Sequence, residues 1–320
     1  MSQTSWSQHL KPKLILRVAL VLIALVWLFH LFSSYPRNFQ HDVDTPRSLP
    51  QSQRKIGKVT MLFGERKQTF EKALVTHQEH SHRLGYPLFI LREPLIDGVW
   101  NKPAFMIRLL LQELERPLDQ RLEWLFWFDA DSVLMNPNMP LETFLPPTDL
   151  THVHLLISKD WNGLNYGAFF LRVHPWSVDL LSANIAYRTM RPGVDLFWHE
   201  QSALVNILKE NSKMAESVVY CPLRWFNAYA RSADGKSLNP HSPTKFQVHP
   251  GDLLVHFPGT APDKLDSTLG PYLAIAQSHQ AEWELPLENT GYIEQTTLFW
   301  KDKKPQPGPV RKNNTDIKLN

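Results

Sequence analysis

The sequence has one cysteine, little net charge and no internal repeat. Its single thiol, Cys221, excludes a disulfide within the chain, so the folded domain must depend on its apolar core, and we expect Cys221 to be a buried apolar residue rather than a nucleophile. A formal net charge of +3 over 320 residues, with the basic residues scattered, gives no electrostatic basis for binding nucleic acid. With 43% apolar residues, the chain can bury a sizeable core in one large globular domain.

The N-terminal region contains one long apolar run. Residues 14–32 read LILRVALVLIALVWLFHLF, with only Arg17 and His30 as polar interruptions. This length suits a helix that spans a bilayer, and the basic residues before and within its start predict a cytosolic N-terminus. A cleaved signal peptide is the alternative, but the apolar run is longer than usual for one and residues 32–35 make a poor cleavage site. The pattern therefore predicts an uncleaved signal anchor, with the rest of the chain in the lumen of the secretory pathway.

Composition divides the chain into five segments. Residues 33–55 are rich in Ser, Pro and Gln, which is typical of a flexible stem, and the last residues are rich in Lys and Pro, which is typical of disorder. Asn313 begins a candidate glycosylation sequon. The predicted segments are a cytosolic tail (1–13), a transmembrane anchor (14–32), the stem (33–55), a lumenal domain (56–300) and a disordered basic tail (301–320).

Strand-like and helix-like patterns alternate along the lumenal domain. This order predicts an α/β domain with a mixed, mostly parallel sheet. The predicted strands are 59–63, 86–91, 124–128, 153–158, 168–173 and 251–257, and the predicted helices are 67–84, 104–115, 178–188 and 200–210.

Two aspartates follow the most apolar predicted strand. Asp129 and Asp131 come directly after residues 124–128, and ligands of open α/β sheets collect beyond the carboxyl ends of the strands. Side chains at i and i+2 of extended backbone point to the same side, so the two carboxylates can share one cation, which relieves their repulsion. Oxygen ligands favour Mg²⁺ or Mn²⁺, with a diphosphate as the inferred ligand. The alternative is that both aspartates only cap the turn at residues 136–138.

Five segments occur in an order that resembles a known family. They are WFDADSVLMN, KDWNGLNYGAFFLR, HEQSAL, RWFNAY and VHPGDLLVHFPG, and the similarity covers roughly residues 56–275. Together they resemble the fungal galactosyl- and mannosyltransferase family, glycosyltransferase family 34, which also includes plant xyloglucan xylosyltransferases. The resemblance implies a GT-A-type, Rossmann-like nucleotide-sugar-binding domain. It also implies a retaining transfer of a hexose that depends on Mn²⁺, with Mg²⁺ as the alternative ion.

The resemblance assigns the metal ligands. It implies that Asp129, Asp131 and His256 bind the metal and the donor diphosphate, and it places Gly259 in the same donor-binding block. One imidazole among carboxylates is compatible with Mn²⁺. Without the resemblance, a histidine in a strand is more often a core residue with satisfied hydrogen bonds.

Residues 160–167, DWNGLNYG, combine amide and carboxylate side chains with two glycines. Amides can hydrogen-bond sugar hydroxyls, and glycines let the backbone approach a ligand closely. An ordinary Asn-Gly turn is the alternative. By resemblance, Asp160, Asn162, Gly163 and Asn165 line the donor and acceptor pocket, with Asp160 among the catalytic residues. Tyr166 departs from the small polar residue common in the family, which puts the local pocket shape in doubt.

Further site residues follow from the same resemblance. Glu200 and Gln201 open a predicted helix, where a glutamate could simply serve the helix dipole. The family places this pair near the anomeric carbon, with Gln201 stabilising the developing positive charge. Lys102 is a candidate contact to the diphosphate, unless it is an exposed lysine at a helix start. Gly64 and Glu65 should lie near the nucleotide base.

Other aromatic and histidine residues carry weaker predictions. Trp225, Phe226 and Asn227 shape the acceptor site, unless the aromatic pair belongs to the core. The histidines at the end of the first long helix would complement its dipole as imidazolium groups, and those near the fourth strand alternate along its edge; neither group receives a function. They are His77, His80 and His82, and His152 and His154.

The preferred function is that of a single-pass type II enzyme of the Golgi membrane. It would transfer galactose from UDP-galactose, or next mannose from GDP-mannose, to an α-mannoside of an oligosaccharide or glycoprotein, alone or in a complex with other Golgi glycosyltransferases. Whether Glu200 acts as a nucleophile or only binds the donor stays open. The alternatives are a non-catalytic glycan-binding or scaffold subunit and a metal-dependent nucleotide-sugar hydrolase, although such hydrolases usually assemble two metals.

Overall fold

The structure is a computed structural model, and it describes residues 43–44, 56–64 and 68–303. These residues belong to the unit His41–Asn320. The predicted anchor, the rest of the stem and residues 304–320 lie outside the described residues, as do Glu65 and Asn313. Of the helices that the structure describes, none is both long and apolar enough to cross a bilayer.

A seven-stranded mixed sheet organises the fold, in the order β1-β3-β2-β4-β7-β6-β8. Strand β2 pairs in parallel with β3 and β4, and β6 with β8. The pairs β1–β3, β4–β7 and β6–β7 are antiparallel, so the prediction of a mostly parallel sheet is wrong. A two-residue turn joins β6 to β7, and such a hairpin reverses the chain. The strands are β1 (Val43–Asp44), β2 (Ile56–Met61), β3 (Leu88–Leu91), β4 (Trp124–Phe128), β6 (Leu155–Asp160), β7 (Gly163–Arg172) and β8 (Val218–Cys221).

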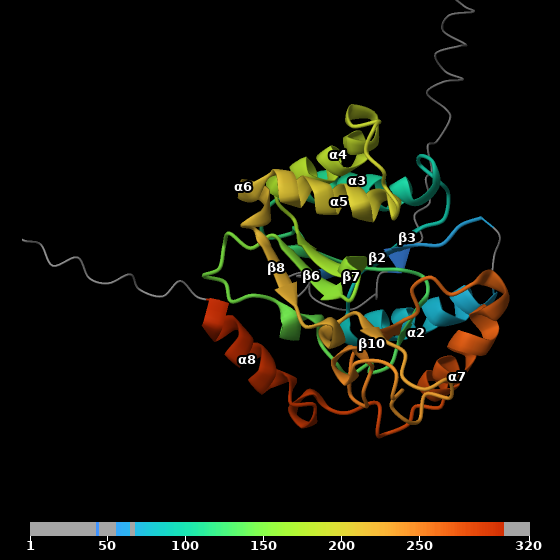
Figure 1. The fold of residues 1–320 in the computed structure, drawn as a ribbon. Helices are drawn as coiled ribbons and strands as arrows, with labels where there is room; N and C mark the ends of the chain where they lie inside the picture. Colours follow the sequence, from blue (N-terminus) through green and yellow to red (C-terminus); the bar gives the residue numbers. More distant parts are fainter. Residues whose placement is uncertain (1–42, 45–55, 65–67, 304–320) are drawn as a thin grey trace, which may run out of the picture. The chain divides into compact units, whose positions relative to one another are not determined.

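Helices cover both faces of this sheet (Figure 1). One face carries α3 (Asn101–Glu115), α4 (Pro175–Met190), α5 (His199–Glu210) and the short α6 (Ser212–Ala215). On the other side lie α2 (Gln68–Leu84), α7 (Leu265–Gln277) and α8 (Tyr292–Lys303), together with a small sheet of order β5-β10-β9. The strands of this small sheet are β5 (Ser132–Leu134), β10 (Leu254–His256) and β9 (Ala228–Tyr229).

Strand β4 shows why an unbroken apolar run is needed at the centre. Phe126 and Phe128 pack into the core on the α2 side, whereas Leu125 and Trp127 pack into the core under α3 and α5. Because successive side chains of a strand point to opposite faces, a strand covered on both faces must be apolar at every position. The predicted bounds of β4 are confirmed.

Several elements escaped prediction from the sequence. The strands β5, β8 and β9 are only two to four residues long, too short to show a periodic pattern. Helix α8 continues to Lys303, past the predicted end of the domain at residue 300. Trp225 and Phe226 are buried in the core, which was the alternative reading of that aromatic pair, and Cys221 is a free, buried thiol as predicted.

The histidines of α2 do not serve its dipole, so that prediction is wrong for two of them. His77 and His80 are fully buried, and burial lowers the pKa of both imidazoles, assisted by the nearby Lys58. The Lys58 ammonium nitrogen donates to the carbonyl oxygen of His77 over 2.8 Å and lies 3.1 Å from Nδ1 of His80. The ring of Phe128 stacks on His77 at 3.7 Å. These histidines belong to the core beneath β4.

Candidate active site

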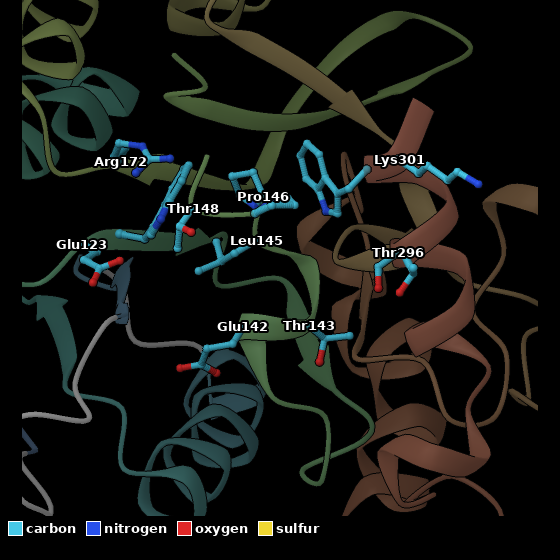
Figure 2. A pocket seen from close by; sticks show the side chains of 13 residues that line it. Glu123, Glu142, Thr143, Leu145, Pro146, Thr148, Arg172, Thr296 and Lys301 are labelled. Carbon is cyan, nitrogen blue, oxygen red and sulfur yellow. The ribbon is translucent and has the colours of Figure 1, made fainter. Parts of the chain in front are cut away.

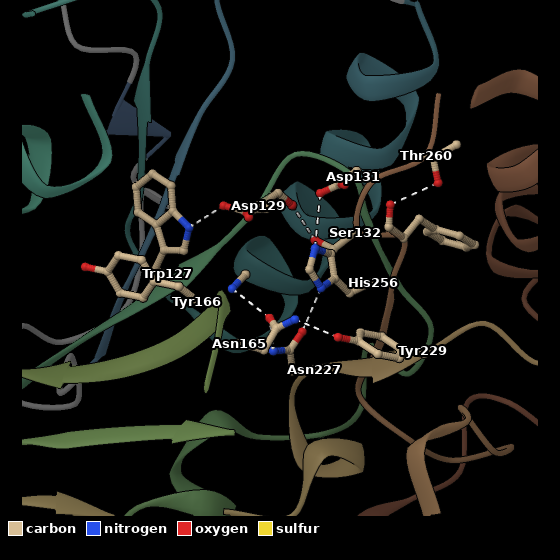
Figure 3. A network of polar contacts seen from close by, with 12 residues as sticks. Trp127, Asp129, Asp131, Ser132, Asn165, Tyr166, Asn227, Tyr229, His256 and Thr260 are labelled. Atoms are coloured by element: carbon tan, nitrogen blue, oxygen red, sulfur yellow. Dashed lines mark hydrogen bonds and ion pairs between the residues drawn. The ribbon is translucent and has the colours of Figure 1, made fainter. Parts of the chain in front are cut away.

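Three predicted ligands meet where β4 ends (Figure 3). Asp129 and Asp131 follow β4 directly, and antiparallel pairing of β10 with β5 sets His256 opposite Ser132. One ligand atom from each of Asp129, Asp131 and His256 lies within 4.8 Å of the other two. The pairing of two short strands therefore brings a histidine from late in the chain to the two aspartates.

The hydrogen bonds of Asn227 define the tautomer of His256. The Asn227 amide nitrogen donates to Ser158 Oγ over 2.9 Å and to Asn165 Oδ1 over 2.8 Å, so only its oxygen is left for His256 Nδ1, at 2.8 Å. Nδ1 must then carry a proton and donate it to Asn227, which leaves Nε2 to face the other side of the ring.

Nε2 of His256 faces a carboxylate. Nε2 of His256 is 3.3 Å from Asp131 Oδ1, and Asp131 and Asn227 lie on opposite sides of the ring (Figure 3). With Nε2 unprotonated, this imidazole and the two carboxylates form a ligand set that fits a divalent ion such as Mn²⁺ or Mg²⁺. The sequence assigned Asn227 only to the acceptor site, and the structure places it where it orients His256.

A glycine makes room for the imidazole. A Cβ atom added to Gly167 would lie 2.1 Å from Cε1 of His256. No side chain fits at that distance, so strand β7 can approach His256 only with glycine at this position. The glycines of residues 160–167 were expected to allow close approach of a ligand, and Gly167 instead allows close approach of a ligand-binding side chain.

Lys102 lies inside the acidic cluster rather than on the surface. Its side chain is buried, with Nζ 2.9 Å from Asp129 Oδ1 and 3.5 Å from Glu200 Oε1. The alternative of an exposed lysine is therefore wrong. Burial alone would lower the pKa of Lys102, but the charges of Asp129 and Glu200 outweigh it and raise the pKa above its usual value.

Glu200 is the buried acid of this cluster. It lies in the first turn of α5, and burial raises its pKa; Lys102 opposes that shift and the charge of Asp129 adds to it. The indole N–H of Trp127 donates to Asp129 Oδ1 over 2.7 Å and orients that carboxylate. Asp129 thus accepts bonds from an ammonium and an indole while it stays within reach of a cation.

An irregularity in β7 presents backbone groups to the cluster. The register between β6 and β7 shifts between Leu156 and Ser158, which frees the backbone of Tyr166 from the β6 ladder. Its N–H donates to Gln201 Oε1 over 2.9 Å, and its carbonyl oxygen accepts from Lys102 Nζ over 3.0 Å. Gln201 is therefore held by its oxygen, and its amide NH₂ group has no hydrogen bond to Tyr166.

The tip of the β6–β7 hairpin is held by Asp160. This carboxylate accepts hydrogen bonds from the hydroxyl of Tyr229, from the backbone N–H of Asn162 at 2.6 Å and from Nδ2 of Asn165 at 3.0 Å. Burial, and then the bond to Asp160, raise the pKa of the Tyr229 phenol. Gly163 adopts a φ of 107°, which favours glycine. The segment is thus both a turn and part of the network that reaches His256 through Asn165 and Asn227.

Two predicted donor-binding residues stay apart from this cluster. Gly64 and Gly259 follow β2 and β10 and both adopt positive φ, of 83° and 71°. Within the part of the chain that the structure describes, no hydrogen bond or ion pair joins either one to Asp129, Asp131 or His256. Their roles stay predictions.

Two cavities differ in their relation to the site. One, of about 470 Å³, lies between α5 and the β6–β7 hairpin and is lined in part by Asn162, Gly163 and Gln201. The other, of about 620 Å³, lies at the opposite end of β4, and Figure 2 shows Arg172 on one side of it and Thr296 and Lys301 of α8 on the other. No predicted site residue lines this second cavity, so only the first adjoins the candidate site.

Comparisons with known proteins agree with the predicted resemblance. The sequence profile of the galactosyl transferase GMA12/MNN10 family matches residues 146–266. A probable alpha-1,2-galactosyltransferase of Schizosaccharomyces pombe, gmh1, is 27% identical over 52% of this chain and 54% of its own length. An alpha-1,2-galactosyltransferase of the same organism is 26% identical over 59% of this chain and 56% of its own. A probable xyloglucan 6-xylosyltransferase of Arabidopsis thaliana is 33% identical, but over only 27% of this chain and 19% of its own length.

A solved structure supports the fold. The crystal structure of a glycosyltransferase involved in the glycosylation of the major capsid of PBCV-1 superposes with a TM-score of 0.50 and 16% identity, and covers 67% of this chain and 98% of its own. The mixed α/β sheet and this likeness fit the predicted GT-A-type fold. The chain matches little more than half the length of its fungal relatives. The resemblance that the sequence motifs predicted is confirmed: residues 146–266 of this chain are similar to the galactosyl transferase GMA12/MNN10 family.

Proposed function

We propose that this protein is a metal-dependent, retaining hexosyltransferase that uses a nucleotide sugar as donor. The observation that carries the proposal is the convergence of Asp129, Asp131 and Nε2 of His256 at the end of β4. Gln201 and the Lys102–Glu200 pair lie beside it. When bound, Mn²⁺ or Mg²⁺ would supply Lewis-acid stabilisation of the charge on the departing nucleoside diphosphate.

The surroundings of Glu200 favour a supporting role over a nucleophilic one. Its carboxylate is 6% exposed and pairs with Lys102, so it is not presented to a sugar as a free nucleophile. We therefore favour front-face transfer. The acceptor hydroxyl oxygen bonds to the anomeric carbon, the bond from that carbon to the diphosphate oxygen breaks, and the hydroxyl proton passes to the departing phosphate.

Two residues of the chain assist this reaction in the proposal. Lys102, whose pKa is raised, keeps its proton at neutral pH and adds a positive charge where the diphosphate leaves. Gln201, held by its bond to the backbone of Tyr166, offers its amide to the sugar that carries the developing positive charge. Asp160 orders the hairpin beside them.

The proposed substrates follow the fungal relatives. Two of these are alpha-1,2-galactosyltransferases by name, one of them probable, so UDP-galactose is the first donor to test and GDP-mannose the second, with an α-mannoside as acceptor. We also propose that the protein is a type II protein of the Golgi membrane, with the domain of residues 56–300 in the lumen. Protection of this domain from added protease in sealed Golgi vesicles would test that orientation.

The decisive experiment uses the full-length protein. Nucleotide release from UDP-galactose and GDP-mannose is measured with and without Mn²⁺ and methyl α-mannoside. For the double variant Asp129→Asn with Asp131→Asn, we expect Mn²⁺ affinity and turnover each to fall by at least about a hundredfold. Asp119→Asn, which changes an exposed aspartate outside the cluster, is the control and should match wild type.

The outcomes separate the remaining functions. A nucleotide-sugar hydrolase would release nucleotide at the same rate with and without acceptor, and three ligand side chains suit one ion rather than the usual two. A non-catalytic subunit would consume no donor. Either result would end the transferase proposal.

A further inference from the structure

A cavity of about 470 Å³ opens beside the candidate active site, between α5 and the β6–β7 hairpin. This volume lies in the range of about 300–1,000 Å³ that is typical of small-ligand sites. Asn162 and Gly163 line it from the hairpin and Gln201 lines it from α5, so the cavity shares residues with the candidate site. A ligand in this cavity would lie next to the sugar held by Gln201.

The sheet topology separates this cavity from the nucleotide side. Strands β3, β2 and β4 form the parallel half of the sheet, and parallel strands bind nucleotides beyond their carboxyl ends. The cavity belongs to the other half, where β7, β6 and β8 lie, with Tyr220 of β8 on its wall. A donor bound across Asp129 and Asp131 would leave this half of the sheet to the second substrate.

Exposed aromatic side chains mark the cavity. Phe197 is 74% exposed and Trp198 is 45% exposed, and their rings meet edge to face at 5.1 Å. Large aromatic side chains exposed together indicate a binding surface. Sugars present apolar C–H faces, which suit aromatic rings, and hydroxyl edges, which suit amides and hydroxyls.

The polar lining suits a neutral ligand. Gln201, Ser202 and Asn206 supply amide and hydroxyl groups along α5. Three charged residues line the cavity: Lys159 is held over the ring of Tyr220, at 3.7 Å from its centroid, and Asp195 and Lys209 carry opposite charges. Amides and hydroxyls beside aromatic rings therefore match a saccharide better than a charged group.

Trp198 is held in position although it is exposed. Its backbone N–H donates to Ser202 Oγ over 2.9 Å, and its carbonyl oxygen accepts from the N–H of Gln201 over 3.0 Å. The next residue, His199, adopts a φ of 46°, in the left-handed region that costs energy for a residue with a side chain. These bonds hold the backbone of Trp198 and Gln201 in one turn, and a preorganised backbone favours binding.

We propose that this cavity, with Trp198 and Phe197 at its edge, binds the glycan acceptor through the sugar that precedes the one receiving the hexose. The inference rests on the proposed transferase function and names the second substrate's site. The ligand is a neutral oligosaccharide of at least two rings, with one ring stacked on Trp198 and its hydroxyls bonded by the amides of Asn206 and Asn162.

The test compares Trp198→Ala with Met190→Ala in the full-length protein. Met190 is 76% exposed at the end of α4 and does not line the cavity, so its variant is the control. Binding and KM are measured for methyl α-mannoside and for an α-linked mannotriose, together with Mn²⁺ affinity. We expect Trp198→Ala to raise the Kd and KM of mannotriose at least about tenfold while those of methyl α-mannoside change little. Trp198→Phe should restore most of the affinity.

The outcomes distinguish this inference from the function on which it rests. If Trp198→Ala binds mannotriose as wild type does, the inference is overturned, whereas donor turnover would still support the transferase. If wild type consumes no donor but binds mannotriose, and Trp198→Ala does not bind it, the transferase proposal fails and the glycan-binding surface stands. Should Trp198→Ala not fold, Phe197→Ala repeats the comparison, because Phe197 is largely exposed and the Ser202 bond stays intact.

Discussion

Two lysines are buried against β4, one on each face, and their pKa values shift in opposite directions. Lys102 lies over the rings of Trp127 and Tyr166 on the α3 side, and Lys58 lies over Phe128 on the α2 side. The pKa of Lys102 is raised because Asp129 and Glu200 outweigh burial. The pKa of Lys58 is lowered by burial alone.

The difference shows that a buried lysine takes its charge state from its neighbours. Among the described residues, the hydrogen-bond partners of Lys58 are a carbonyl oxygen and a neutral imidazole, which do not repay the loss of hydration of an ammonium group. Lys102 has two carboxylates in reach. The face with the carboxylates is the candidate site, and the other face is core. Ser132 joins them, since its hydroxyl donates to the carbonyl of Asp129 over 2.7 Å and lies 3.2 Å from Nε2 of His77.

Removing the Lys102 ammonium from the candidate site should have the largest effect. We expect Lys102→Met to lower the free energy of unfolding by about 3–5 kcal/mol at pH 7, because it leaves the buried Glu200 and the partly buried Asp129 without a counter-charge. The loss should be smaller at pH 5, since Glu200, whose pKa is already raised, then takes up a proton. Urea denaturation at both pH values measures this. The control is Lys72→Met, at an exposed position of α2, and a loss below about 1 kcal/mol for Lys102→Met would contradict the paired state.

Removing the Lys58 amine from the core should instead change how the free energy of unfolding depends on pH. The unfolded chain keeps the lysine proton up to a pKa of about 10.4, whereas folded Lys58 releases it at lower pH, so the unfolded state binds more protons between the two values. The free energy of unfolding should therefore rise with pH in that window, by up to about 1.4 kcal/mol per pH unit. Lys58→Met should flatten this rise between about pH 8 and pH 10 in urea denaturation. Equal slopes in the two proteins would mean that Lys58 is charged when folded.

Removing the Glu200 carboxylate tests the charge balance around Lys102. Burial raises the pKa of Glu200, so the folded chain holds its proton to higher pH than the unfolded chain, and stability falls as pH rises through that window. Glu200→Gln should remove this fall and change the free energy of unfolding at pH 7 by about 1 kcal/mol. Denaturation between about pH 4.5 and pH 7 measures it. A variant that keeps the wild-type pH slope would show that Glu200 does not hold the extra proton.

The smallest effect is expected from removing the hydroxyl of Tyr166, one of the two rings over Lys102. The hydroxyl of Tyr166 is buried and, among the described residues, has no hydrogen-bond partner, whereas the ring over Lys58 is a phenylalanine. Tyr166→Phe keeps the ring over Lys102 and removes an unsatisfied group, so it should leave stability unchanged or raise it by up to about 1 kcal/mol. Thermal or urea denaturation decides. A clear loss would mean that the hydroxyl bonds a water or ligand.

Local patterns predicted much of the fold. The bounds of β4 and the presence of α2, α3, α4 and α5 follow from apolar periodicity, which depends on neighbouring residues in the chain. The balance of parallel and antiparallel pairs was predicted wrongly because the hairpin turn at residues 161–162 changes the direction of β7, and the Asn-Gly signal there was only one of two readings. The strand that carries His256, β10, lies within the predicted strand 251–257, but its short partner β5, which sets His256 beside the aspartates, has no such pattern.

For the candidate site, the sequence by itself determined that two carboxylates follow a buried strand, that the chain has one thiol and that its motifs resemble a glycosyltransferase family. Only the tertiary structure decided that Nε2 of His256 faces Asp131, that Lys102 lies between Asp129 and Glu200, and that Trp198 shares a turn with Gln201. The physical reason is that backbone conformation is largely set by neighbours in the chain. The charge and tautomer of a side chain are set by burial and by partners a few ångströms away, and folding brings those partners from distant parts of the sequence.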